Sequence, residues 1–125
     1  MRHRIQETLC RLASVAYQTK YIIHGTAEEY VLPDELLDSA CSIIETTLNS
    51  TVLSKSLSQY EVQELSTLLT KLRKLQQQIP FNQAGVSNYE LVQKNPSWLE
   101  ASNLARRGLE MMGYDLSECE QEDDL

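Results

Sequence analysis

The chain has 125 residues with a formal net charge of −7, and 42% of the residues are hydrophobic, so it is long enough to fold as one domain around a buried core. It contains only 4 glycines and 3 prolines, which leaves little material for a catalytic site built on glycine-rich phosphate-binding loops. No window approaches the ~20 apolar residues of a membrane-spanning helix, and polar residues from Gln6 to Thr8 interrupt the N-terminal segment, so we expect neither a membrane protein nor a secretory leader.

The first predicted helix begins at Arg2 or His3 and ends at Ile23. Apolar residues recur in it at spacings of three and four, as they do on one face of an α-helix. These residues are Ile5, Leu9, Leu12, Val15 or Ala16, and Ile22 or Ile23. We therefore expect a single helix that turns this face toward the core.

The second predicted helix begins at Pro33, which suits the first turn because its missing N–H would be unpaired there in any protein. Acidic residues follow in the opening turns, where the helix dipole favours negative charge. The helix closes at Asn49. Its apolar face consists of Leu37, Ala40, Cys41, Ile44 and Leu48.

The third predicted helix, from Ser58 to Pro80, has the most regular pattern. Ser58 and Glu61 have capping-box spacing at its start, and Pro80 ends it by disfavouring α geometry at the preceding residue. Its apolar seam consists of Leu65, Leu68, Leu72, Leu75 and Ile79. A homodimer through this seam is one alternative, but three heptads are short for a free coiled coil, so we expect an intramolecular core.

A short helix is predicted over residues 88–94, because Ser87 and Glu90 repeat the capping-box spacing. It lies within the longest irregular region of the chain, residues 81–95. Long connections in compact domains often carry function. We therefore treat this region as a candidate binding loop.

The last predicted helix is capped by Asn95, has Pro96 in its first turn and ends at Gly113. Its apolar face consists of Trp98, Ala101, Ala105, Leu109 and Met112. Gly108 lies on the same face, where the missing side chain allows a neighbouring element to approach closely.

Residues 115–125 form an acidic C-terminal segment. They include six acidic residues and no Lys or Arg, so the rest of the chain has a net charge of only −1. The six are Asp115, Glu118, Glu120, Glu122, Asp123 and Asp124. Because this composition buries little apolar surface, we expect a flexible tail.

Together these elements predict an all-α fold: an up-down bundle of four main helices, with a short extra helix before the last one and an acidic C-terminal tail. Residues 1–114 would form the helical bundle domain, and residues 115–125 the tail.

Two pairs of acidic residues provide an enzymatic alternative. Glu35 and Asp38, and likewise Glu61 and Glu64, are three residues apart, so each pair lies on one helical face. Two such faces on adjacent helices would offer the oxygen ligands that Mg²⁺ prefers, as in a Mg-dependent all-α phosphohydrolase. Capping and the helix dipole explain acids at these positions equally well. The leading prediction therefore has no cofactor.

The three cysteines, Cys10, Cys41 and Cys119, are an odd number without paired spacing. This pattern favours reduced thiols and a cytoplasmic location. Cys10 and Cys41 lie on or beside apolar faces and are predicted to be core residues. Neither the cysteines nor His3 and His24 have the spacing of zinc ligands.

The function that the sequence favours is a non-enzymatic protein-binding module: a small adaptor, chaperone-like or inhibitor protein. Its basic residues are too dilute for a nucleic-acid footprint. Tyr89 and Tyr114 suit an interface with another protein, where aromatic residues are enriched. The acidic tail suits a partner with a basic surface. We therefore predict partner binding through these two tyrosines and the six acidic residues of the tail.

Overall fold

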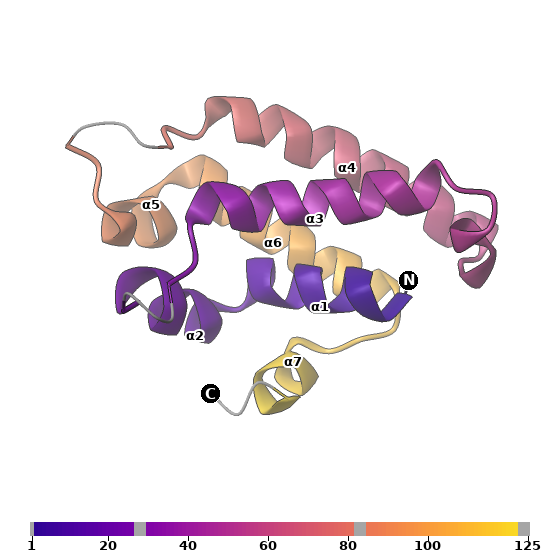
Figure 1. The fold of residues 1–125 in the computed structure, drawn as a ribbon, viewed down its shortest axis with the longest axis horizontal. Helices are drawn as coiled ribbons and strands as arrows, with labels where there is room; N and C mark the ends of the chain where they lie inside the picture. The colour runs from indigo at the N-terminus through magenta and orange to yellow at the C-terminus, as the bar shows by residue number, and fades with distance from the viewer. Residues whose placement is uncertain (1, 27–29, 82–84, 123–125) are drawn as a thin grey trace.

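The computed structural model of the chain is all-helical (Figure 1). It describes residues 2–26, 30–81 and 85–122, with residues 120–122 described by their backbone alone. The prediction of an all-α fold is confirmed for these residues. Within the same ranges, no helix has the length and apolar character needed to cross a membrane.

The described chain contains seven α-helices, one π-helical segment and one 3₁₀ turn. In chain order they are α1 (Arg2–Ala13), α2 (Val15–Gln18), η1 (Thr19–Ile23, π-helical), α3 (Pro33–Leu48), η2 (Leu53–Ser56, 3₁₀), α4 (Gln59–Gln78), α5 (Asn88–Lys94), α6 (Pro96–Met111) and α7 (Leu116–Glu122).

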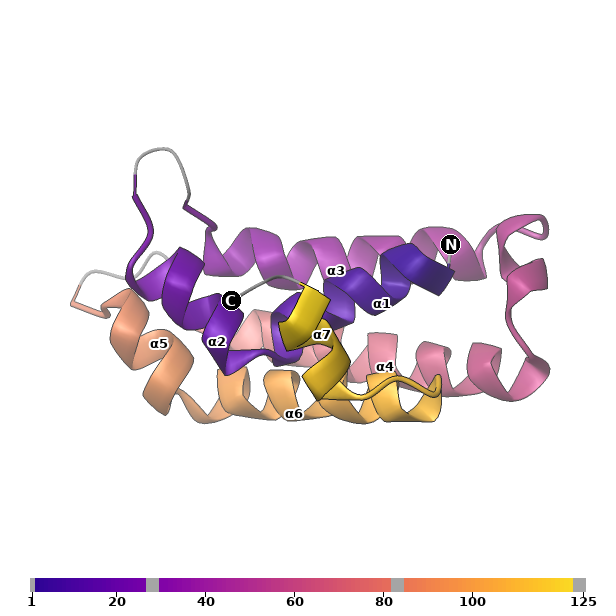
Figure 2. The same cartoon turned by 90° about the horizontal axis from the view of Figure 1, so that it is seen from below.

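Four long helices build the body of the molecule. α1 packs against α3 and α6, and α4 packs against the same two helices from the other side. The two views in Figures 1 and 2 agree on this arrangement. α5 lies at one end, beside η1 and α6, whereas α7 folds back and packs against α1 and α6 (Figure 2).

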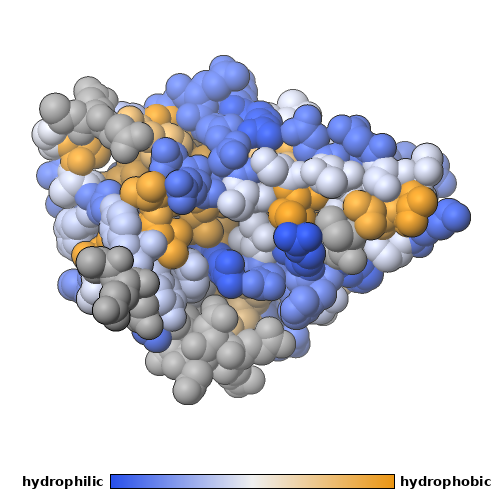
Figure 3. Space-filling view, viewed as in Figure 1, coloured by the Kyte–Doolittle hydropathy of each residue, from blue (hydrophilic) through white to orange (hydrophobic). Residues whose placement is uncertain are grey.

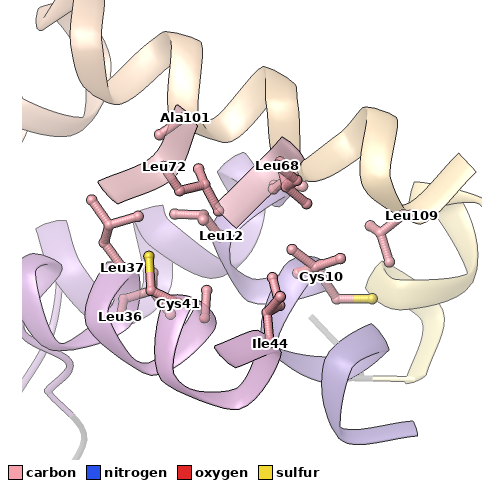
Figure 4. Packing of buried hydrophobic residues seen from close by; sticks show 14 of the residues in the cluster. Cys10, Leu12, Leu36, Leu37, Cys41, Ile44, Leu68, Leu72, Ala101 and Leu109 are labelled. Carbon is pink, nitrogen blue, oxygen red and sulfur yellow. The ribbon is translucent and has the colours of Figure 1, made fainter. Parts of the chain in front are cut away.

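The apolar faces of the four long helices meet in one core (Figure 4). All five residues of the seam on α4 are at most 6% exposed, so the expectation that this seam is internal is confirmed. Trp98 and Leu109 of α6 are fully buried as well. Gly108 lets α6 approach closely, because a Cβ atom there would lie 2.9 Å from Cδ2 of Leu68 on α4.

Helix boundaries follow the capping signals closely. Pro33 occupies the first turn of α3, and Ser58 and Glu61 form a reciprocal capping box on α4. Asn95 accepts a hydrogen bond from the backbone N–H of Trp98 at the start of α6. Gly113 follows α6 with φ of +88°, a conformation that costs glycine little.

The first predicted helix is not continuous, because the helical conformation is interrupted at Ser14. This residue has extended geometry (φ −85°, ψ 114°), and its hydroxyl accepts a hydrogen bond from the backbone N–H of Tyr17. Ser14 therefore ends α1 and caps α2. The apolar periodicity continues across the break, and for that reason the periodicity alone did not reveal it.

The buried side-chain amide of Gln18 forms a hydrogen bond with a backbone carbonyl that this interruption leaves unpaired. Gln18 is 2% exposed, and its Nε2 donates to the backbone oxygen of Leu12 at 2.7 Å. Its Oε1 accepts a hydrogen bond from the indole nitrogen of Trp98 at 3.2 Å. One side chain thus satisfies a carbonyl freed by the break and also the polar atom of the largest core residue.

Two predictions about the C-terminal region differ from the structure. Cys10 and Cys119 form a disulfide, so the prediction of reduced thiols is wrong for this pair; Cys41 is a free, buried cysteine. Residues 116–122 form α7, which packs against α1, whereas a flexible tail was expected over residues 115–125. Sequence spacing gave no sign of the bond, because the two cysteines are 109 residues apart.

Replacing Gln18 with leucine should lower the free energy of unfolding by about 2–4 kcal/mol, because the carbonyl of Leu12 and the indole N–H of Trp98 would both be buried without a partner. Urea denaturation followed by circular dichroism measures the change. Gln77→Leu, on the exposed side of α4, is the control and should change stability by less than about 0.5 kcal/mol. If the two substitutions changed the free energy of unfolding equally, the buried hydrogen bonds of Gln18 would not stabilise the fold.

Candidate functional site

The structure separates the two acidic pairs that were considered as metal ligands. Asp38 on α3 pairs with Arg73, in the second half of α4, whereas Glu61 lies in the first turn of α4. Twelve residues of helix separate Arg73 from Glu61, which is roughly 18 Å. The pair of Glu35 and Asp38 therefore lies far from the pair of Glu61 and Glu64.

Glu61 is engaged by a different charge. Its two carboxylate oxygens accept hydrogen bonds from Nη1 of Arg2 at 2.6 and 2.7 Å, and Oε1 also accepts the backbone N–H of Ser58 at 2.9 Å. Nη2 of Arg2 donates to the backbone oxygen of Met112 at 3.2 Å. Hydrogen bonding to Arg2 lowers the pKa of Glu61 despite its burial. This cluster joins the ends of α1, α4 and α6.

Asp38 belongs to a second ion-pair network. Arg73 donates to Asp38 at 3.0 Å and to Glu45 at 2.9 Å, which places one guanidinium between two carboxylates two turns apart on α3. Gln76 also donates to Asp38. Hydrogen bonds from Arg73 and then from Gln76 lower the pKa of Asp38. The network links α3 to α4 at the surface of the molecule.

These contacts do not bring together the two acidic pairs of the magnesium alternative. Among the described residues, no group of three or more Asp, Glu, His or Cys side chains is positioned to hold a metal ion. Asp38 and Glu61 pair with different arginines at different ends of α4. The two acidic pairs are therefore not positioned to bind one metal ion together. Asp38 pairs α3 with α4, and Glu61 both caps α4 and pairs it with α1.

The two tyrosines predicted to bind a partner do not form one patch. Tyr89 lies on α5 and is 53% exposed, whereas Tyr114 is half-buried between α6 and α7. The 16 residues of α6 separate them, a helix length of roughly 24 Å. Tyr89 remains available to a partner, while Tyr114 packs against the core.

The six acidic residues of the C-terminal segment divide into three groups. Asp115 and Glu118 are exposed, and both belong to the docked segment around α7. Glu120 and Glu122 lie in the last turn of α7, where only the backbone is described. Asp123 and Asp124 lie outside the described residues.

A concave surface occurs at the end of the molecule that carries α5. It is a cleft of about 370 Å³ between the start of α3 and the segment that leads into α5, and we call it the end cleft. Its lining residues are Tyr30, Leu32, Pro33, Asp34, Pro80, Phe81, Val86, Ser87, Asn88 and Leu91. Figure 3 shows apolar side chains gathered over this end of the molecule.

Rigid elements position the walls of the end cleft. Pro33 starts α3 on one side, and the turn after α4 carries Phe81 on the other side. The backbone N–H of Val31 donates to the carbonyl of Tyr21 at 3.0 Å, which anchors the segment before α3. The amide of Asn88 donates to the hydroxyl of Tyr30 at 2.7 Å and so links the two walls.

The floor of the end cleft is connected to the core by an aromatic pair. Phe81 meets the ring of Trp98 edge to face, with centroids 6.3 Å apart and an interplanar angle of 86°. This is a favoured geometry for aromatic pairs. Because Trp98 is the single tryptophan of the chain, its emission reports on the environment of Phe81.

Apolar and acidic groups share the rim of the cleft. Tyr30 and Leu32 are 45% and 37% exposed, and Asp34 contributes a carboxylate to the lining. A neighbouring hollow shares Pro80 and Val86 with the cleft and adds Glu90 and Lys94. The surface offered to a ligand therefore mixes apolar and polar side chains, and its edge carries two carboxylates, from Asp34 and Glu90, and the amine of Lys94.

Half of the residues that line the end cleft lie in the region 81–95, which the sequence marked as a candidate binding loop. The residues of the opposite wall were not assigned to any site, and neither Leu32 nor Phe81 was singled out. One signal was available: both are large apolar residues that lie outside every helical stripe. Such residues between helices have no assigned place in a core, and this makes them candidates for surface recognition.

Comparisons of the chain with protein-family models, with curated proteins and with solved structures gave no match.

Glu61→Gln should lower the free energy of unfolding by about 1–2 kcal/mol near neutral pH, because it weakens a charge-assisted pair. The pKa of Glu61 is lower in the folded chain than its ordinary value of 4.5. Its stabilisation is therefore fully present above that value and is lost as pH falls through the folded-state pKa. The variant should also lose less stability on acidification, as urea denaturation across a pH series would measure.

Glu64→Gln is the matched control, since Glu64 is exposed one turn further along α4. It should change stability by less than about 0.5 kcal/mol at neutral pH. If Glu61→Gln and Glu64→Gln gave the same acid profile, the pair between Arg2 and Glu61 would not stabilise the fold.

Proposed function

We propose that this chain is a non-enzymatic protein-binding module that holds a segment of another protein in the end cleft. The observation that carries the proposal is the concave surface itself, with exposed large apolar side chains at Tyr30 and Leu32. An adaptor, chaperone-like or inhibitor protein requires such a surface on a stable scaffold. We propose that an up-down bundle of α1, α3, α4 and α6 provides that scaffold.

The chemistry of the cleft favours a partner segment with apolar side chains flanked by Lys or Arg. Phe81, Val86 and Leu91 offer apolar contact, while Asp34 would attract a positive charge. Tyr89, next to the cleft residue Asn88, adds exposed aromatic surface on α5. Aromatic anchors of this kind contribute strongly to protein interfaces.

The acidic residues of the C-terminal segment support the same choice of partner. Asp115 and Glu118 are exposed, and with Glu120, Glu122, Asp123 and Asp124 they give the segment a negative charge that would attract a basic surface over long range. We also propose a cytoplasmic location, in which the bond between Cys10 and Cys119 would form under oxidising conditions and be broken under reducing ones.

The proposal predicts that peptides selected on the purified chain from a random library will combine apolar residues with Lys or Arg. Leu32→Glu should weaken their binding at least about tenfold, because it places a charge in the apolar lining and desolvates it on binding. Isothermal titration calorimetry gives the affinities, and quenching or shift of Trp98 emission locates the binding near Phe81.

The matched control is Val52→Glu, which introduces the same charge at a residue that is 70% exposed, just before η2 and outside the lining of the end cleft. Its affinities should stay within about twofold of the unmodified chain, since surface substitutions away from a site have small effects. The proposal fails if no peptide is enriched, or if binding survives Leu32→Glu and is lost in Val52→Glu.

A further inference from the structure

The disulfide between Cys10 and Cys119 joins the first helix to the last described one. Their Cα atoms are 5.6 Å apart, and the two residues are 5% and 3% exposed. The bond lies away from the end cleft, on the side of the molecule where α7 crosses α1 (Figure 2). Nothing in the proposed function uses it.

α7 has little besides this bond to hold it in place. It has seven residues, fewer than the roughly 12–15 that an isolated helix needs for stability. Among its side chains that the structure describes, Leu116 is half-buried and Cys119 is buried, whereas Ser117 and Glu118 are exposed. Among the side chains of α7 that the structure describes, the docked ones are therefore Leu116 and the disulfide-bonded Cys119.

The hydrogen bonding of the segment is local. Outside the helix ladder, the backbone N–H groups of Ser117 and Glu118 both donate to Asp115, the first to its carboxylate and the second to its carbonyl. Residues 115–122 also contain four acidic residues and no basic one, so like charges oppose a free helix. By contrast, Tyr114 is anchored to α6 through its N–H to the carbonyl of Leu109 at 2.9 Å.

We infer that the bond between Cys10 and Cys119 is a redox-controlled clasp, which ties the acidic segment after Tyr114 to α1 when oxidised and releases it when reduced. Disulfides that form in cytosolic proteins are usually transient and regulatory. Here the change in redox state would alter whether the acidic segment is docked on α1 or free to contact a partner. The inference is independent of the end cleft.

Release requires a dithiol reductant. One of its thiolates attacks a sulfur of the bond, forms a mixed disulfide with that cysteine and expels the other cysteine as a thiolate, which takes up a proton. The second thiol of the reductant then displaces the first cysteine and closes the reductant into a disulfide. Two electrons and two protons pass to Cys10 and Cys119, and oxidation by a disulfide compound reverses the exchange.

The third cysteine does not interfere with the clasp. Cys41 is fully buried in the core on α3, and burial raises the pKa of its thiol to about 11. A thiol with so little thiolate is a poor partner in exchange. The oxidised chain should therefore contain one thiol and the reduced chain three, a difference that alkylation after unfolding measures directly.

The test compares hydrogen exchange of the full chain, oxidised with glutathione disulfide and reduced with dithiothreitol. Intact mass confirms the two states, because the oxidised chain lacks two hydrogen atoms. Reduction should accelerate exchange in the peptide covering 115–125 by at least about tenfold while peptides of α3, α4 and α6 keep their protection. Cys119→Ser should behave as the reduced chain under both conditions, and Cys41→Ala should still respond to reductant.

Three results would overturn the clasp. The first is three alkylated thiols after treatment with glutathione disulfide, which would mean that the bond does not form. The second is equal exchange of the 115–125 peptide in the oxidised chain, the reduced chain and Cys119→Ser, because docking would then not depend on the bond. The third is loss of protection from hydrogen exchange throughout α3, α4 and α6 on reduction, which would mean that the bond stabilises the whole fold and not the acidic segment alone.

Discussion

The close approach of α6 to α4 at Gly108 is the constraint on which the rest of this structure depends. Because Gly108 has no side chain, Leu68 of the α4 seam and Leu9 of α1 pack against the position where a Cβ atom would lie, at 2.9 and 3.4 Å from it. This contact joins the apolar faces of α1, α3, α4 and α6 in one continuous core. None of these helices could bury its apolar face alone. The cluster of Arg2, Glu61 and Met112 then fixes one end of the body.

Local signals in the sequence predicted the helices well, because each helix end is decided by a few neighbouring atoms. Ser58 with Glu61, Asn95 with Pro96, and Gly113 mark boundaries that the structure reproduces. The break at Ser14 was missed for a physical reason. A serine inside an apolar period can face solvent in a helix or cap a new one, and a distant partner, Trp98, helps to decide between them by bonding Gln18.

The candidate site was harder to predict than the fold, since it is made where chain segments meet. Tyr30 and Asn88 are 58 residues apart and join the walls of the end cleft. Cys10 and Cys119 are further apart still. Asp38 and Glu61 match the spacing of metal ligands in the sequence, but in the structure each carboxylate forms an ion pair with an arginine. Sequence spacing does not indicate these arginine partners.

The bond between α1 and α7 has a topological consequence for the oxidised chain. It closes a ring that contains almost every residue, with short ends outside Cys10 and Cys119. A single cut in any connection inside that ring leaves both pieces covalently joined, so a nicked chain keeps its core partners at high effective concentration. A cut in the connection between α3 and α4, for example, would leave the piece with α1 and α3 joined through the bond to the piece with α4 and α6.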